Sequence, residues 1–177
     1  MGSAQFANVE FDKLKEVAKL PGLGMQEAVK GSINLQSIGF SAEKARNSMQ
    51  VFGNAVATVG KGRAEFERAI YGLQQLANTD FPLGEDLNIL KDAIPQITPL
   101  LKEAFGTART EELQKLGISS KQVIDVITEG LGKLPKVTGG IKGAFENFSD
   151  SMTTTLARIG SVIDKNFNIT KIIDKIT

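Results

Sequence analysis

The feature that most constrains the fold is a run of apolar residues at helical spacing near residue 50. Ala42, Ala45, Met49, Phe52, Val56 and Val59 follow one another at intervals of 3, 4, 3, 4 and 3. This spacing places all six on one face of an α-helix and predicts an amphipathic helix with one buried side. Ser41 precedes the run as a candidate N-cap, and Gly60 and Gly62 follow it as breakers.

Similar spacing recurs along most of the chain and predicts further helices. They are expected at residues 6–19, 24–38 and 63–77, around the stripe of leucines and isoleucine from 83 to 94, from Thr98-Pro99 to Gly106, from Thr110 to Gly117, and from Ser119 or Ser120 to about 131. Tyr71 is expected to be a half-buried core residue. No alternating run of strand length and no Asn-Gly or Asp-Gly hairpin signal is present. The sequence therefore predicts an all-α fold: an irregular bundle of short-to-medium helices with a longer C-terminal helix.

Two segments share one pattern for joining helices. Ile38-Gly39-Phe40-Ser41 and Leu116-Gly117-Ile118-Ser119 each place a glycine just past a helix, then an apolar residue, then a serine. A glycine tolerates the left-handed backbone that ends many helices, and serine is a favoured N-cap. Both segments are therefore expected to form tight corners between helices.

The amino acids that are missing limit the chemistry. The 177 residues include no His, Cys or Trp, so thiolate nucleophiles, zinc–sulfur sites and the usual neutral-pH acid–base residue are excluded. The acidic pairs Glu85/Asp86 and Glu111/Glu112 are adjacent in sequence and point in different directions on a helix. The chain is therefore predicted not to be an enzyme, with no catalytic residues, no metal site and no cofactor.

The charge pattern also argues against several partners. There are 21 basic and 20 acidic residues, and the two signs are interleaved, so no nucleic-acid specificity is expected. Lys61 and Arg63 flank Gly62, but the loop follows no strand and lacks the spacing of a phosphate-binding loop. It is interpreted as a turn between helices with solvated cations.

The C-terminal stretch carries the candidate interaction site. After Gly139-Gly140, one stripe of apolar residues continues at helical spacing and is the candidate partner-packing face: Ile141, Phe145, Phe148, Met152, Leu156, Ile159 and Ile163. Two interpretations stay open. One is a final helix docked on the core, and the other is a helix that leaves the domain and packs on another chain or on the next part of a longer protein. The expected organisation is a tag-like N-terminus at 1–5 that suggests a fragment of a larger protein, a compact helical domain at 6–138, a long amphipathic helix at 139–167 and a short apolar tail segment at 168–177.

The order of the motifs resembles one known family, the tape measure proteins of long-tailed bacteriophages and prophages. The resemblance spans residues 16–150 and is carried by the segments 16–23, 35–45, 52–62, 66–70, 83–90, 94–95, 100–106, 116–119 and 145–150. It implies a long helical protein that lies in the lumen of the tail tube, sets tail length and is released when DNA is ejected. It also implies assembly in the bacterial cytoplasm, with tail tube and tail assembly proteins as partners and self-association in the full-length protein.

Two other functions are kept as alternatives. A helical scaffold or adaptor module would bind partner helices in its apolar grooves. A segment for DNA delivery would lay the apolar stripe on a membrane, although Glu146, Asp150 and Asp164 oppose this. The sequence contains no run of 18 apolar residues, so it does not indicate a membrane span.

Overall fold

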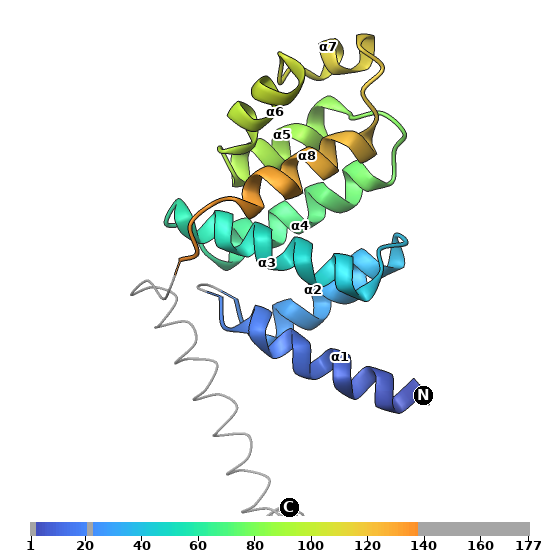
Figure 1. Ribbon diagram of the computed structural model, residues 1–177, viewed down its shortest axis with the longest axis vertical. Coiled ribbons are helices and arrows are strands. Elements are labelled where there is room, and N and C mark those ends of the chain that lie inside the picture. Colours follow the sequence, from blue (N-terminus) through green and yellow to red (C-terminus); the bar gives the residue numbers. More distant parts are fainter. Residues whose placement is uncertain (1–2, 21–22, 138–177) are drawn as a thin grey trace, which may run out of the picture.

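The computed structural model describes residues 3–20 and 23–137, which form eight helices and no strand (Figure 1). The bounds are α1 Ser3–Ala18, α2 Met25–Ser37, α3 Ala42–Thr58, α4 Arg63–Ala77, α5 Gly84–Ala93, α6 Ile97–Phe105, α7 Thr110–Lys115 and α8 Ser120–Gly132. The predicted all-α fold is confirmed, and the helices are of short to medium length as expected. The predicted C-terminal helix lies outside the described residues.

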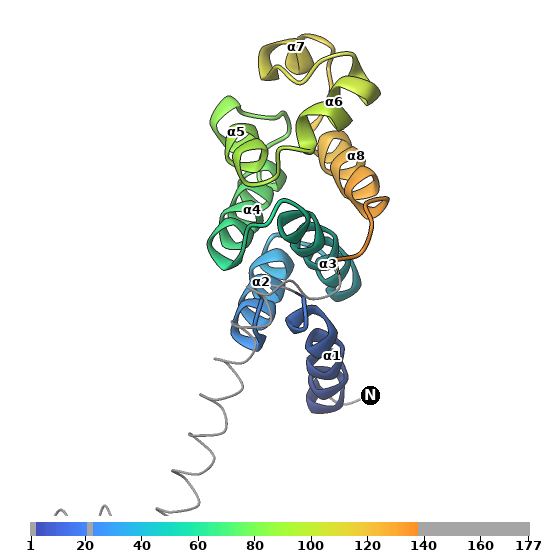
Figure 2. The ribbon, with the colours of Figure 1, turned by 90° about the vertical axis from the view of Figure 1, so that its left-hand side faces the viewer.

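The helices pack in a series of neighbouring pairs. α1 packs on α2, α2 on both α3 and α4, and α4 on α5. α8 then returns across the molecule and packs on α3, α4 and α6, so the end of the described chain closes over its middle (Figure 2). In both views α1 lies near one end of the described part and α7 near the other.

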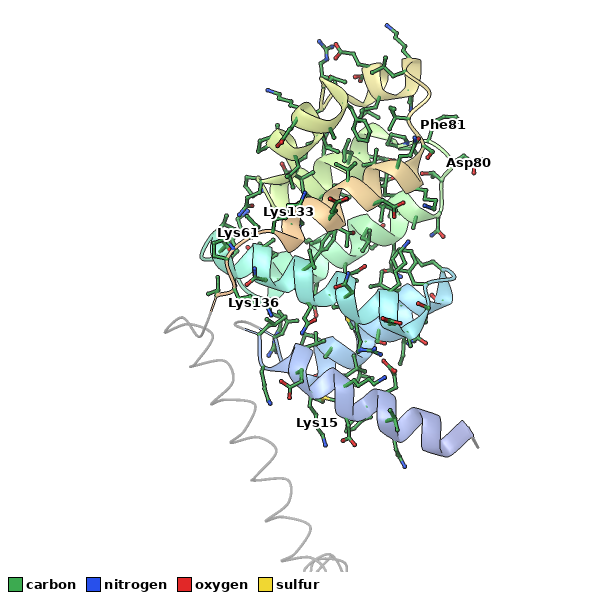
Figure 3. The ribbon with its side chains drawn as sticks, in the orientation of Figure 1. Lys15, Lys61, Asp80, Phe81, Lys133 and Lys136 are labelled. Atoms are coloured by element: carbon green, nitrogen blue, oxygen red, sulfur yellow. The ribbon has the colours of Figure 1, made fainter. Side chains whose placement is uncertain are left out.

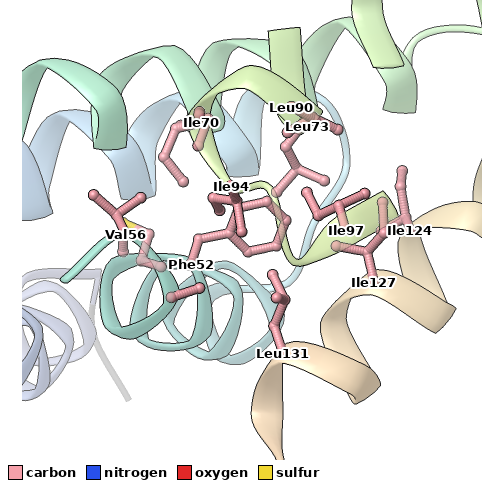
Figure 4. Close-up of a cluster of buried hydrophobic side chains, with 14 of the residues drawn as sticks. Phe52, Val56, Ile70, Leu73, Leu90, Ile94, Ile97, Ile124, Ile127 and Leu131 are labelled. Carbon is pink, nitrogen blue, oxygen red and sulfur yellow. The ribbon is translucent and has the colours of Figure 1, made fainter. Parts of the chain in front are cut away.

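The core lies where α3, α4, α5, α6 and α8 meet. Phe52 is fully buried at its centre (Figure 4), and the surrounding side chains include Val56, Ile70, Leu73, Leu90, Ile94, Ile97, Ile124, Ile127 and Leu131. Burying one such side chain contributes about 1.5–3 kcal/mol, so this cluster supplies much of the driving force for folding. Four of the six residues of the stripe from 42 to 59 are buried: Ala45, Met49, Phe52 and Val56. Val59 is 36% exposed because it caps the end of α3, where the chain already turns away.

The two predicted corners have the expected geometry. Gly39 and Gly117 have φ of 91° and 70°, the left-handed region that favours glycine. At each corner the following residue donates a backbone hydrogen bond back into the helix, from Phe40 to Leu35 at 3.1 Å and from Ile118 to Leu113 at 3.0 Å. These bonds satisfy carbonyl groups that the end of a helix leaves free.

Each corner then starts the next helix with its serine. Ser41 Oγ accepts from Lys44 N at 3.1 Å, and Ser119 Oγ accepts from Gln122 N at 3.3 Å. At the second corner Gln122 also returns a bond, because its Oε1 accepts from Ser119 N at 2.9 Å. The second corner is therefore a complete capping box and the first has the serine cap alone.

The start of α6 differs from the sequence prediction. Thr98 and Pro99 were expected to be the cap and first helical residue, but the helix begins at Ile97 and Gln96 is its N-cap. Pro99 is the third residue of α6 and is tolerated there because the first four N–H groups of a helix have no partner within it. The turn at Ile94–Gln96, where Ile97 N donates to Ile94 O, starts the helix early.

The N-terminal helix is attached by apolar contacts and one ion pair. Leu14 and Val17 are buried, while Val9 and Phe11 are 49% and 48% exposed. Glu10 lies on the same face as Leu14 and pairs with Arg46 of α3 where both side chains are largely buried. α1 therefore begins at Ser3 and is held to α3 as well as to α2.

Candidate interaction surfaces

The predicted partner-packing face falls outside the part of the chain that the structure describes. Its seven residues, from Ile141 to Ile163, all follow Val137, which is the last described residue. That stripe therefore stays a prediction. The surfaces that can be assessed are those of residues 3–20 and 23–137.

The glycine-rich loop before α4 is a structural turn, and its lysine has a specific partner. Lys61 Nζ donates to the carbonyl oxygens of Asp92 at 2.6 Å and Ala93 at 3.3 Å. These carbonyls end α5, where a cation is favoured by the helix dipole. The predicted inter-helix turn is confirmed, but Lys61 caps a neighbouring helix and is not simply solvated.

Acidic residues of the described part lie in the first turns of several helices, among them Glu27, Glu43 and Glu65. Within that part no group of three or more acidic, His or Cys side chains could hold a metal ion. Asp86, in the first turn of α5, is buried, and this burial together with the nearby charge of Glu85 raises its pKa above the ordinary value. Such a group destabilises the fold when it ionises, because burial disfavours the charged form of a carboxyl group.

Cations gather where the described chain ends, yet two of them are already engaged. Figure 3 shows Lys61, Lys133 and Lys136 on the same side of the molecule. Lys133 pairs with Glu129 of its own helix at 3.1 Å, and Lys61 caps α5. Lys61 and Lys133 therefore stabilise the ends of helices within the domain.

The outer face of α2 is an apolar surface that the sequence analysis did not predict. The apolar residues of the helix predicted at 24–38 are Met25, Ala28, Val29, Ile33 and Leu35. The structure buries Ala28 and Leu35, leaves Met25 and Val29 half-buried, and exposes 61% of Ile33. Met25, Val29 and Ile33 recur every four residues, and this spacing was the signal that could have identified them as a second stripe.

Met25, Val29 and Ile33 line a shallow depression, called here the α2 outer face. Gln26, Lys30 and Asn34 border it, so its edge is polar. On the other side of Lys30 and Asn34, a depression between α2 and α4 has Phe66 and Ile70 in its lining and encloses about 250 Å³. Small-molecule pockets usually enclose ~300–1,000 Å³, so the depression between α2 and α4 is smaller than most of them. The row of three apolar side chains on the α2 outer face suits the apolar side of another helix.

Tyr71 lines the same depression and is 52% exposed. Its side chain is thus about half-buried, as expected, but it lies at the surface between α2 and α4 and is not part of the core. A second group of exposed apolar side chains lies at the far end of the molecule. There Gln114 Nε2 donates to Pro82 O at 2.7 Å and holds α7 beside the loop before α5. Phe81, Leu83 and Leu116 are 48%, 43% and 60% exposed there.

No helix among the described residues combines the length and hydropathy needed to cross a membrane.

Comparison with known families gives one match. A family model described as "Tape measure protein" matches residues 1–168, nearly the whole chain. Neither the curated proteins nor the solved structures gave a match. The family match agrees with the resemblance carried by the ordered motifs between residues 16 and 150. The chain belongs to the tape measure protein family and has a structural role in the phage tail.

Proposed function

We propose that this chain is a folded part of a tape measure protein that sets the length of the tail tube. In this role the protein lies in the tube lumen and is released on DNA ejection, after assembly in the bacterial cytoplasm. The observation that carries the proposal is the family match over residues 1–168. The all-helical architecture supports it, because helices give a long protein a length in proportion to its number of residues.

The proposed division of labour follows the organisation of the chain. Residues 6–138 form the compact domain, and residues 139–167 form a helix whose apolar stripe, from Ile141 to Ile163, packs on tail tube or tail assembly proteins or on another copy. Residues 168–177 form a separate apolar segment. An amphipathic helix that lays its apolar side into a groove is a common mode of protein recognition and needs no catalytic residue.

Location in the tail can be tested on purified tails from the phage or prophage that encodes this chain. We expect peptides from residues 8–137 in intact tails by mass spectrometry. We also expect those peptides to resist added protease until DNA ejection is triggered. Protection that is lost on ejection places the protein in the lumen and shows its release.

Two results would overturn the proposal. The first is the absence of these peptides from intact tails, with recovery of the protein on a host protein that is not part of the tail, as an adaptor would give. The second is digestion of the protein in tails that still hold their DNA, because a protein in the lumen is shielded by the tube.

A further inference from the structure

The described part of the chain ends in a short segment that runs from α8 to α3. α8 ends at Gly132, and the five residues 133–137 that follow it are called here the exit strap. In Figure 1 the exit strap is the orange segment that leads from the end of α8 past α3.

One side chain of α3 holds the exit strap at two points. Asn54, only 8% exposed, donates from Nδ2 to Pro135 O at 3.0 Å, and its Oδ1 accepts from Val137 N at 2.7 Å. A side-chain amide carries both a donor and an acceptor, so a single residue can bond the backbone on both sides of Lys136. The two bonds are made by one side chain and are therefore expected to form and break together.

The first residues of the exit strap continue the last turn of α8. Lys133 N donates to Gly130 O at 3.2 Å, and Leu134 N donates to Leu131 O at 3.1 Å. Bonds of this kind, between residues three apart, tighten the final turn of many helices. Leu134 is half-buried against the core. The last turn of α8 and the exit strap thus form one continuous hydrogen-bonded unit.

This last turn closes the core. Leu131 is fully buried, and Figure 4 shows it pointing toward Phe52. Gly130 lets α8 approach α6 so closely that a Cβ placed there would lie 2.5 Å from Leu100 Cδ2. If the last turn of α8 opens, Leu131 moves away from Phe52 and the centre of the core is uncovered.

The end of α8 lacks the closure that other helices of the described part have. α2, α3, α6 and α7 are each followed within two residues by a glycine of positive φ. Lys133, the C-cap of α8, has right-handed backbone with φ of −83°, and the exit strap contains no glycine. A helix end without such a closure opens easily, because its last carbonyl groups have no partner within the helix.

We propose that Asn54 and the exit strap form a latch that keeps the last turn of α8 closed over Phe52. Release of Asn54 opens residues 130–137 as one unit, while α3 and α4 stay folded. A pull on the chain that follows residue 137 therefore acts first on this latch. The proposal does not rest on the proposed function, since every contact in it lies within one domain.

Amide hydrogen exchange followed by NMR tests the latch in the whole 177-residue chain. Asn54→Ala removes both bonds, so the amides of Lys133, Leu134 and Val137 should exchange about tenfold faster. The amide of Leu73, buried in α4, should keep its rate because it reports on unfolding of the whole domain. Asn47→Ala is the matched control, because Asn47 lies two turns earlier on α3 and is exposed.

A second variant acts from the exit strap and leaves α3 and α8 unchanged, so it decides the question even if Asn54→Ala does not fold. Val137→Pro removes the N–H group that donates to Asn54 Oδ1, because proline has none. Exchange at Lys133 and Leu134 should again become faster. The double variant should exchange no faster than Asn54→Ala alone, because both changes remove the same bond.

Two results would overturn the latch. In the first, Asn54→Ala speeds exchange at Val137 alone, which would mean that the packing of Leu131 and Gly130 holds the end of α8 without help. In the second, the amide of Leu73 speeds up as much as those of the exit strap, which would make Asn54 a contributor to global stability and not a local latch.

Discussion

The core around Phe52 and the α2 outer face are built from the same kinds of side chain, but their surroundings differ. Phe52 is surrounded by residues of α3, α4, α5, α6 and α8 and has no exposed surface. Ile33 stands in line with Met25 and Val29 and keeps 61% of its surface exposed. Helical spacing alone makes an apolar face, and the arrangement of the other helices decides whether that face is closed. Stability should therefore depend on the first region and association on the second.

The most direct test of this difference is to truncate one side chain in each region. Phe52→Ala removes a ring at the centre of the core and should lower the free energy of unfolding by about 3–5 kcal/mol. Ile33→Ala, the matched change on the α2 outer face, should shift it by about 0.5 kcal/mol or less. Urea unfolding followed by circular dichroism measures both. Similar losses for the two variants would show that the α2 outer face is part of the core.

The ion pair between α1 and α3 tests whether the N-terminal helix belongs with the core. Glu10→Gln removes the partner of a largely buried guanidinium and should cost about 1–3 kcal/mol, because Arg46 is left without its countercharge. Asp12→Asn, which breaks the exposed pair with Lys15, is the control and should change little. A loss for Glu10→Gln no larger than for Asp12→Asn would mean that α1 contributes little to the stability of the domain.

The two corners between helices are expected to depend on the left-handed backbone of their glycines. Gly39→Ala and Gly117→Ala force an alanine into left-handed backbone and should each cost about 1–2 kcal/mol. Gly84→Ala is the control, because Gly84 has no contact that a Cβ would disturb and begins α5 with ordinary backbone. If thermal unfolding shows Gly84→Ala to be as harmful as the corner variants, backbone handedness is not what the corners require.

The smallest expected effect is a pH dependence at the start of α5. Burial raises the pKa of Asp86, so its stabilising contribution is present below its unfolded pKa and is lost as pH rises through its folded pKa. Asp86→Asn cannot ionise, so its stability relative to the unsubstituted protein should increase as pH rises above about 4. Unfolding at pH 3.5 and at pH 7 measures this difference. A difference that does not change with pH would contradict the assignment.

Local features were predictable from the sequence and tertiary ones were not. The stripe on α3 and the caps at Ser41 and Ser119 depend on residues three or four positions apart, so spacing and residue type were enough. Exposure of Ile33 and Tyr71 depends on which side of α2 and α4 faces a neighbouring helix. The early start of α6 depends on a turn at Ile94–Gln96 that the Thr-Pro signal concealed.

The surfaces were harder to predict than the fold for the same reason. Asn54 holds Pro135 and Val137, more than 80 residues away, and Lys61 caps a helix whose end is about 30 residues away. Neither contact leaves a pattern in the sequence, since a buried Asn and a loop Lys are common in many settings. The predicted stripe from Ile141 to Ile163 stays a prediction, because it follows the last described residue.

Tail length, measured by electron microscopy, tests the central claim most directly. A series of in-frame deletions in the gene that encodes this chain should leave residues 6–137 intact and remove increasing lengths of the remaining coding sequence. If the protein is a helical ruler, tails should shorten in proportion to the residues removed, by about 1.5 Å for each helical residue. Tails that keep a constant length across the series would contradict the account.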